Sequence, residues 1–113
     1  MSDRDVLSIV EIPYETGERQ LRYSRYMSND GTRWIRHGLF EAYYKNGQLS
    51  SEGTYEDGME VGMWRDYHDN GRLAAEGEYK EGRENGRWRY WRSDGTLEKE
   101  VVYFNGNPVS QSS

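Results

Sequence analysis

A repeat with a period of 24 residues constrains this chain more than any other feature of the sequence. Three copies begin at Gly38, Gly62 and Gly86 and align without a gap. Several residue types recur at one fixed spacing, which is the signature of a repeat architecture rather than of accidental similarity. The recurring positions are Phe40/Trp64/Trp88, Tyr43/Tyr67/Trp91, Leu49/Leu73/Leu97, Glu52/Glu76/Glu100, Tyr55/Tyr79/Tyr103, Gly47/Gly71/Gly95 and Gly58/Gly82/Gly106.

Turn signals within each copy predict a β-hairpin. Asn46-Gly47, Asn70-Gly71 and Asp94-Gly95 favour type I′ turns, because these residues tolerate a positive φ at both central positions. After each turn the pattern alternates with period 2, as in a half-buried strand. Between copies, glycines four residues apart predict a second, slightly longer turn. The expected fold class is therefore all-β: an elongated, single-layer antiparallel meander of consecutive 24-residue hairpins.

The strand that precedes each turn leaves one question open. Trp64 and Tyr67 are three positions apart, so strict alternation places them on opposite faces. Either a bulge intervenes or both faces carry aromatic side chains.

Composition predicts what fills the core. Leu, Ile, Val and Phe together make up only 17 of the 113 residues, a low share that is typical of disordered chains. The chain nevertheless has ten Tyr and four Trp, and disordered chains are poor in such residues. We therefore expect an aromatic core.

The chain is expected to form one domain. Residues 1–37 form a degenerate capping unit, with strands over 6–12, 21–27 and 32–36. Residues 38–61, 62–85 and 86–109 form the repeats, and 110–113 a tail. Terminal repeats are commonly atypical because they cap an array. The polar residues from Asn107 onward are expected to be frayed.

Each unit reads Gly-x-Trp-x-x-Tyr-x-x-Asn-Gly-x-Leu-x-x-Glu-Gly-x-Tyr-x-x-Gly. This pattern resembles the MORN repeat in its bacterial variant form, closely over residues 38–106 and loosely over 14–37. It is also similar to antitoxin-like proteins of the YwqK type, which are found beside bacterial polymorphic toxins. The resemblance implies an elongated sheet that serves as a binding surface, without catalysis. Copy three departs from the pattern at Val101, where the other copies have Gly53 and Gly77, and we interpret this as the end of the array.

Sequence motifs for catalysis are not present. The chain has no Gly-x-Ser-x-Gly, no P-loop and no His-Glu-x-x-His. It has no cysteine, and its only histidines are His37 and His68. His68 shares its column with Tyr44 and Arg92, which indicates a variable surface position rather than a catalytic base. We expect no enzymatic activity, no cofactor and no metal.

Two recurring columns allow a functional and a structural interpretation. Glu52, Glu76 and Glu100 could face a basic partner or a metal, but cross-strand pairing with Arg or Lys is favoured. The aromatic columns could stack on bases or sugars, but the scarcity of aliphatic residues favours a core role. The interleaved Arg and aromatic residues of 87–92 resemble a nucleic-acid stacking strip. A net charge of -5 provides no basic field for phosphate, so nucleic acid is not expected as a partner.

The acidic charge suggests how the chain binds. Carboxylates gather around the junction of repeats one and two, where they would steer a basic partner, although they could equally serve solubility. The leading hypothesis is an antitoxin or immunity protein that occludes a toxin with a basic active site. The predicted partner-binding residues are Tyr44, Glu56, Asp57, Glu60, Asp66, His68, Asp69, Trp91 and Arg92.

The alternative is a structural or scaffold module that localises partners or self-associates, with a homodimer forming through exposed sheet edges. A membrane-surface role fits poorly, because acidic charge repels anionic lipid. The longest apolar runs span three or four residues, too few to cross a bilayer. The N-terminus lacks the basic and apolar regions of a secretory signal, so a cytoplasmic location is expected.

Overall fold

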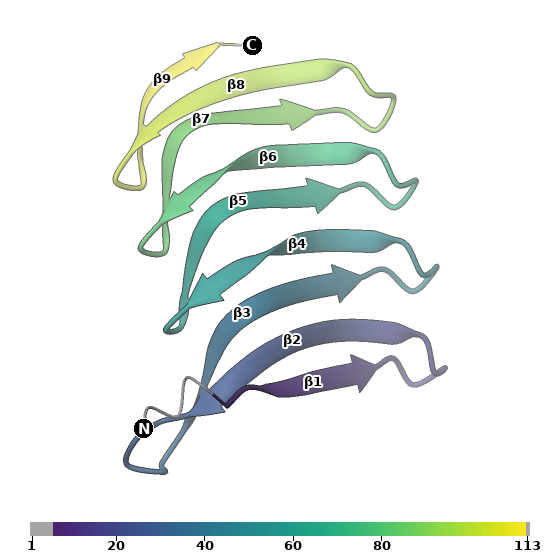
Figure 1. Ribbon diagram of the computed structural model, residues 1–113. Coiled ribbons are helices and arrows are strands. Elements are labelled where there is room, and N and C mark those ends of the chain that lie inside the picture. The colour runs from purple at the N-terminus through teal and green to yellow at the C-terminus, as the bar shows by residue number, and fades with distance from the viewer. Residues whose placement is uncertain (1–5, 113) are drawn as a thin grey trace.

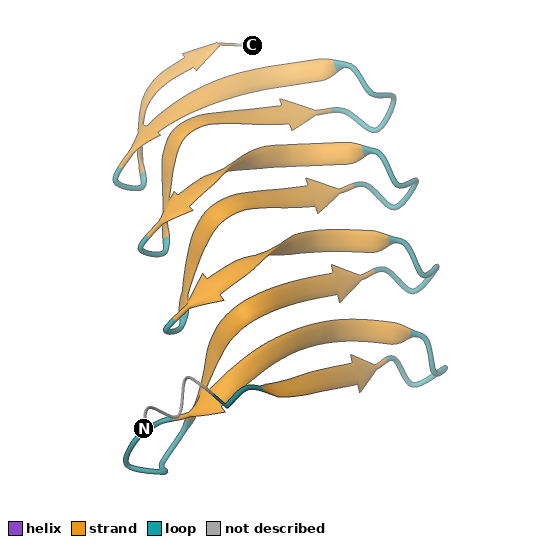
Figure 2. Ribbon diagram, in the orientation of Figure 1, coloured by secondary structure: helices purple, strands orange, loops and turns teal. Residues whose placement is uncertain are grey.

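The computed structural model describes residues 6–112, and they form one open antiparallel sheet in which each strand pairs with the next along the chain (Figure 1). No helix occurs among these residues, as Figure 2 shows. The sheet measures 47 × 37 × 17 Å. The predicted all-β, single-layer meander is confirmed. Its strands are β1 (Ser8–Pro13), β2 (Arg19–Met27), β3 (Trp34–Tyr43), β4 (Leu49–Glu56), β5 (Met59–Tyr67), β6 (Leu73–Lys80), β7 (Arg83–Trp91), β8 (Leu97–Phe104) and β9 (Asn107–Ser112).

Five-residue loops join the strands at one edge of the sheet. In the loop of repeat one, Tyr44 N donates to Gln48 O at 2.8 Å and Gly47 N donates to Tyr44 O at 2.9 Å. Only the glycine has a positive φ, so these are type I turns followed by a left-handed glycine. The type I′ prediction is wrong for all three copies. Asn46 acts through its side chain instead, because its Oδ1 accepts from the Gln48 N–H at 2.9 Å and closes an Asx turn.

Two-residue turns join the strands at the opposite edge, except that six residues connect β2 with β3. Asp57 and Gly58 have φ values of 51° and 89°, and Glu56 pairs directly with Met59. Glu81-Gly82 and Asn105-Gly106 also have a positive φ at both residues. The type I′ geometry therefore occurs between the copies. The prediction of a longer turn at this place is wrong, because the second glycine, Gly62, lies inside β5.

A bend is built into β3, β5 and β7. Glu52 pairs with Arg65 and Thr54 pairs with Val61, so β5 spans two more residues than β4 over the same distance. Gly62 lies within this excess with a φ of 70°. The same shift occurs around Gly38 and Gly86. Such bulges bend a strand and increase its twist, and Figure 1 shows these three strands curving near their starts, at the edge opposite the five-residue loops.

The bend folds a tryptophan onto the preceding repeat. A Cβ added at Gly53 would lie 2.1 Å from Cδ2 of Trp64, so only glycine allows the indole ring to rest on this backbone. The indole N–H of Trp64 donates to Thr54 O at 3.1 Å. Trp88 repeats the arrangement on Gly77. Trp64 and Trp88 are only 7% and 4% exposed, although no second layer covers them.

The two end junctions differ from these internal ones. Between β2 and β3, Ser24 occupies the glycine position and Phe40 the tryptophan position, and the Ser24 hydroxyl donates to His37 O at 2.6 Å. Between β8 and β9, Val101 occupies the glycine position and is 3% exposed. β9 has Ser112 where a further copy would place its tryptophan. Val101 therefore fills the volume that a following indole would take.

β9 itself corrects another expectation. Asn107 to Ser112 form a strand that pairs with β8, so these residues are not a frayed tail. Their backbone groups gain partners from the neighbouring strand, which a polar sequence alone does not reveal. Ser113, the last residue of the predicted tail, lies outside the described residues.

The core is a row of aromatic rings that crosses the sheet. Trp64 contacts the rings of Phe40 at 5.5 Å and Tyr79 at 5.8 Å, and Tyr79 contacts Trp88 at 5.0 Å. Most of these contacts are edge-to-face, the favourable geometry for ring quadrupoles. Trp64 and Tyr67 lie on opposite faces, so both faces carry aromatic side chains. We call the face with this row the aromatic face: Tyr23, Phe40, Tyr55, Trp64, Tyr79, Trp88, Tyr90 and Tyr103.

Candidate binding surface

The opposite face consists largely of paired charges. Arg65 Nε lies 2.7 Å from Glu76 Oε2, and Arg89 Nε lies 2.8 Å from Glu100 Oε2. These contacts confirm the expected cross-strand pairing for Glu76 and Glu100, whereas Glu52 has the Tyr67 hydroxyl as its partner. We call this surface the ladder face: Glu11, Arg22, Glu41, Glu52, Arg65, Glu76, Arg89 and Glu100.

One rung of the ladder face places like charges opposite each other. Glu41 pairs in register with Glu52, where repeats two and three have Arg facing Glu. Tyrosine hydroxyls compensate, because Tyr43 donates to Glu41 at 2.9 Å and Tyr67 donates to Glu52 at 2.5 Å. Burial, followed by the hydrogen bond to Glu52, raises the pKa of Tyr67 to about 12. Each carboxylate of the ladder face therefore has a partner within the sheet.

Carboxylates of the aromatic face lie opposite tyrosines instead of arginines. Glu84 lies opposite Tyr79 in the pairing of β6 with β7, and Glu60 lies opposite Tyr55 in the pairing of β4 with β5. Burial, followed by the nearby carboxylates of Glu84, Glu60 and Asp66, raises the pKa of Tyr79 to about 12. We call Glu60, Asp66 and Glu84, grouped around Tyr79, the acidic centre.

The acidic centre has little internal neutralisation. Within residues 6–112, no Lys, Arg or His forms an ion pair with Glu60, Asp66 or Glu84. Asp66 accepts a hydrogen bond from the Ser51 hydroxyl, which is neutral. The aromatic face therefore presents unpaired negative charge beside aromatic rings, and this is a surface that attracts a cationic partner.

The structure does not bring the nine predicted partner-binding residues together. Glu60 and Asp66 lie in the acidic centre. Glu56 and Asp57 lie at the edge with the two-residue turns, where Asp57 contacts His37. The remaining five lie at or near the edge with the five-residue loops: Tyr44, His68, Asp69, Trp91 and Arg92. Residues adjacent in sequence were separated because β5 runs from one edge of the sheet to the other.

Tyr44 and His68 bind neighbouring repeats together. The Tyr44 hydroxyl donates to Tyr67 O at 2.6 Å, and His68 Nε2 lies 2.8 Å from Trp91 O. Tyr14 makes the equivalent bond to Tyr43 O at 2.8 Å. The His68 column is variable, as expected, and Arg92 is exposed, but Tyr44 and His68 are half-buried and bond to the next repeat. Its members differ in size but share a polar group at the end of the side chain.

Sequence reasoning missed Tyr79 and Glu84 as members of the candidate surface. A signal was available, because Glu84 follows Glu60 by one repeat period. Closeness along the chain groups Glu60 with Glu56 and Asp57, whereas the repeat column groups it with Glu84. In a stack of hairpins, residues one period apart lie on the same face of adjacent repeats.

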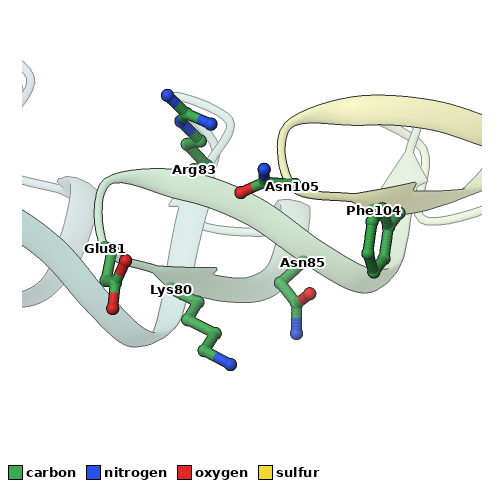
Figure 3. Close-up of a pocket in the computed structure, with 6 residues that line it drawn as sticks. All are labelled: Lys80, Glu81, Arg83, Asn85, Phe104 and Asn105. Atoms are coloured by element: carbon green, nitrogen blue, oxygen red, sulfur yellow. The ribbon is translucent and has the colours of Figure 1, made fainter.

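The structure also has a shallow groove between the last two-residue turns. It has a volume of about 240 Å³ and is lined by Lys80, Glu81, Arg83, Asn85, Phe104 and Asn105. Figure 3 shows Lys80, Asn85 and Phe104 projecting to one side while Arg83 projects to the other. The groove is thus a surface depression rather than the enclosed apolar site that small molecules favour.

Residues 6–112 lack two further classes of site. They contain no group of three or more His, Asp or Glu side chains placed to hold a metal ion. They also contain no helix that is long and apolar enough to cross a membrane.

Comparison with known proteins shows that two segments of the chain are similar to a repeat family. The profile of the MORN repeat variant matches residues 36–57 and 60–81. No curated protein and no solved structure matches the chain. The two matched segments are adjacent repeats and contain Glu60, Gly53 and Trp64. They indicate a repeat module that binds other molecules.

Proposed function

We propose that this protein is a non-catalytic binding module whose acidic centre captures a basic surface of another protein. The observation that carries the proposal is the difference between the faces. Carboxylates of the ladder face have Arg or Tyr partners, whereas Glu60 and Glu84 of the aromatic face lack a cation among the described residues. Unpaired charge of one sign gives specificity and speeds encounter with a partner of opposite charge.

The partner we propose is a toxin with a basic active site, which this protein neutralises by occlusion as an antitoxin or immunity protein of the cytoplasm. The sheet is large enough for this role. Its 47 × 37 Å outline exceeds the roughly 800 Å² per partner of a standard protein interface. Tyr79 and neighbouring rings supply the side chains that interfaces favour as anchors. The resemblance to the MORN repeat variant supports a binding role for the sheet.

The test begins with affinity capture of partners from the native host by the full chain. The captured protein is then purified and mixed with the Glu60→Gln/Glu84→Gln double variant. We expect an equimolar complex, slower association at higher salt, and a loss in affinity of about tenfold or more in the double variant.

Glu98→Gln serves as the control, because Glu98 is exposed on β8, away from the acidic centre. Association that is indifferent to salt, or an equal loss with Glu98→Gln, would contradict a role for the acidic centre. A partner whose activity persists in the saturated complex would contradict neutralisation by occlusion.

A scaffold that self-associates is the second candidate, and β1 favours it. One edge of β1 lacks a neighbouring strand among the described residues, and Ile9 and Ile12 are exposed there. Such an edge can pair with another chain. Light scattering of the full chain tests this candidate: a defined oligomer that dissociates on Ile9→Lys supports it, and a monomer at all concentrations excludes it.

A further inference from the structure

We propose that the aromatic face carries a second binding site, which recognises a carboxylate on a peptide segment of a partner. Two arginines form it, Arg25 on β2 and Arg36 on β3, and we call them the arginine pair. The site lies at the N-terminal end of the aromatic row. Its arginines bind the opposite charge from the acidic centre, and its groove shares only Glu60 with that centre.

The sheet places the two arginines in register on one face, each with its guanidinium held over an aromatic ring. Arg25 and Arg36 are directly opposite each other in the pairing of β2 with β3. The Arg25 guanidinium lies 3.9 Å from the ring centroid of Trp34, and that of Arg36 lies 4.6 Å from the ring centroid of Tyr23. Attraction to aromatic rings fixes both groups in place. Without a further partner, two like charges directly opposite each other destabilise a strand pair.

Neither arginine has an anionic partner in the part of the chain that the structure describes. Arg36 reaches only the Tyr55 hydroxyl, at 3.4 Å, and Nε of Arg25 is buried without a hydrogen-bond acceptor. Arg65 and Arg89 of the ladder face, in contrast, each contact a glutamate. The planar fork of donors on a stacked arginine matches the two oxygens of a carboxylate.

The repeat makes this arrangement more specific. Arg36 precedes Glu60 by one period, and Glu60 precedes Glu84 by one period. One column of the aromatic face therefore reverses its charge at the first unit. Residues 1–37 hold six basic and six acidic side chains, whereas residues 38–113 hold nine and fourteen, so the net charge of -5 belongs to the second region. A polyanion such as nucleic acid would be repelled by that region, but a peptide with an isolated carboxylate would not.

The groove that adjoins the arginine pair, and that Arg36 lines, favours a peptide over an inorganic anion. Arg33, Trp34, Arg36 and Tyr55 line a depression of about 530 Å³, and Asp57 and Glu60 line it as well. A multiply charged phosphate near the arginine pair would also face these carboxylates. A peptide that carries Glu beside Lys presents a carboxylate to Arg36 and an ammonium to Glu60. We therefore assign the site to a segment in which acidic and basic residues are neighbours.

The test uses the full chain and an N-acetylated, C-amidated peptide of alternating Glu and Lys. The matched peptide has Gln in place of each Glu. We expect the Glu–Lys peptide to shift the indole N–H resonance of Trp34 but not that of Trp91, and to bind about tenfold more tightly than the Gln–Lys peptide. Equal binding of the two peptides, or no shift at Trp34, overturns the proposal.

Variants locate the binding. We expect Arg25→Gln and Arg36→Gln each to weaken the Glu–Lys peptide by about tenfold, and Arg89→Gln on the ladder face to leave it unchanged. Arg36 packs on three rings and its loss could unfold the chain, so Arg25→Lys and Arg36→Lys provide a second series that keeps the charge and removes the fork. We expect these to weaken binding by a smaller factor.

Wild-type affinity in all four variants, or the same loss in Arg89→Gln, overturns the assignment to the arginine pair. Inorganic phosphate supplies the remaining comparison. If phosphate displaces the peptide at equal concentration, the site is a general oxyanion site and the assignment to a peptide segment is wrong.

Discussion

The two faces of this sheet are built from alternating residues of the same strands, yet they contribute differently to stability. The aromatic face buries Trp64 and Trp88 against glycine backbone. The ladder face holds ion pairs such as Arg89–Glu100, whose arginine side chain is 47% exposed. Exposed ion pairs contribute about 0–1 kcal/mol each, whereas truncation of a buried aromatic residue costs about 3–5 kcal/mol. A single-layer sheet can therefore place most of its stability on one face.

The largest effect should follow from closing the space under one tryptophan. In Gly77→Ala the new Cβ would lie 2.1 Å from the Trp88 ring, so the indole must leave its site. We expect a loss of about 3–5 kcal/mol in the free energy of unfolding, measured by chemical denaturation.

The N-terminal junction provides a matched rescue for this variant. Because Ser24 there accommodates Phe40, Gly77→Ser/Trp88→Phe should recover part of the stability lost in Gly77→Ser alone. A Gly77→Ala variant as stable as the wild type would show that the stacked indole does not support the fold.

A smaller loss is expected where the array ends. Val101 is 3% exposed on the aromatic face, and Val101→Ala leaves a cavity that no following tryptophan fills. We expect the free energy of unfolding to fall by about 2 kcal/mol. Val102→Ala, whose residue lies on the other face of the same strand, is the control and should cost less. Equal losses would mean that the two faces do not differ at this strand.

The ladder face should respond weakly. Glu100→Gln removes the partner of Arg89 at an exposed site, and we expect a change of at most about 1 kcal/mol in the free energy of unfolding, decreasing further at high salt. Thermal melts at low and high ionic strength measure it. A loss as large as that of Val101→Ala would remove the contrast between the faces.

The smallest expected difference between the two faces is in how the pKa values of their tyrosines respond to the acidic centre. The pKa of Tyr79 is about 12 in the folded chain and has its ordinary value of 10 in the unfolded chain. The phenol therefore ionises at a lower pH in the unfolded chain than in the folded chain. The contribution of Tyr79 to stability is complete below pH 10 and is lost as the pH rises toward 12. Glu60→Gln/Glu84→Gln should lower the pKa of Tyr79 and leave that of Tyr67, whose neighbour is Glu52, unchanged. NMR titration of both rings measures this, and a shared shift would contradict a local acidic centre.

The fold was predictable because the same pattern of hairpin-forming residues occurs three times in the sequence. Columns 24 residues apart specified hairpins, their order and an aromatic core, whichever turn type joined the strands. The type I′ turns were predicted within the copies but occur between them. Asn46-Gly47 fits a type I′ turn and an Asx turn equally well, and the side-chain hydrogen bond of Asn46 decides between them. The bend was hidden for a related reason: Gly62 is a turn residue by type, and only its pairing shows that it lies within β5.

The candidate site was less predictable than the fold. Glu60 and Asp66 were identified from local charge, but the same criterion included His68, whose ring binds the next repeat. Local charge does not report which face a residue occupies or whether a cation across the strand pairs with it. The arginine pair depends on register between β2 and β3, and the six-residue connection between them breaks the period that would have aligned Arg25 with its counterparts.

The glycine that receives each tryptophan also determines how such a chain can lengthen during evolution. A duplicate of residues 62–85 placed after Asn85 brings its own tryptophan and finds a glycine waiting for it, so an interior insertion should be tolerated and should widen the sheet by two strand spacings, about 9–10 Å. A further copy that continued the repeat after β8, in place of β9, would meet Val101, which already occupies the place of an incoming indole. New repeats can therefore be inserted inside the array but not directly after β8. The first and last units of the array can remain unchanged while the width of the sheet changes.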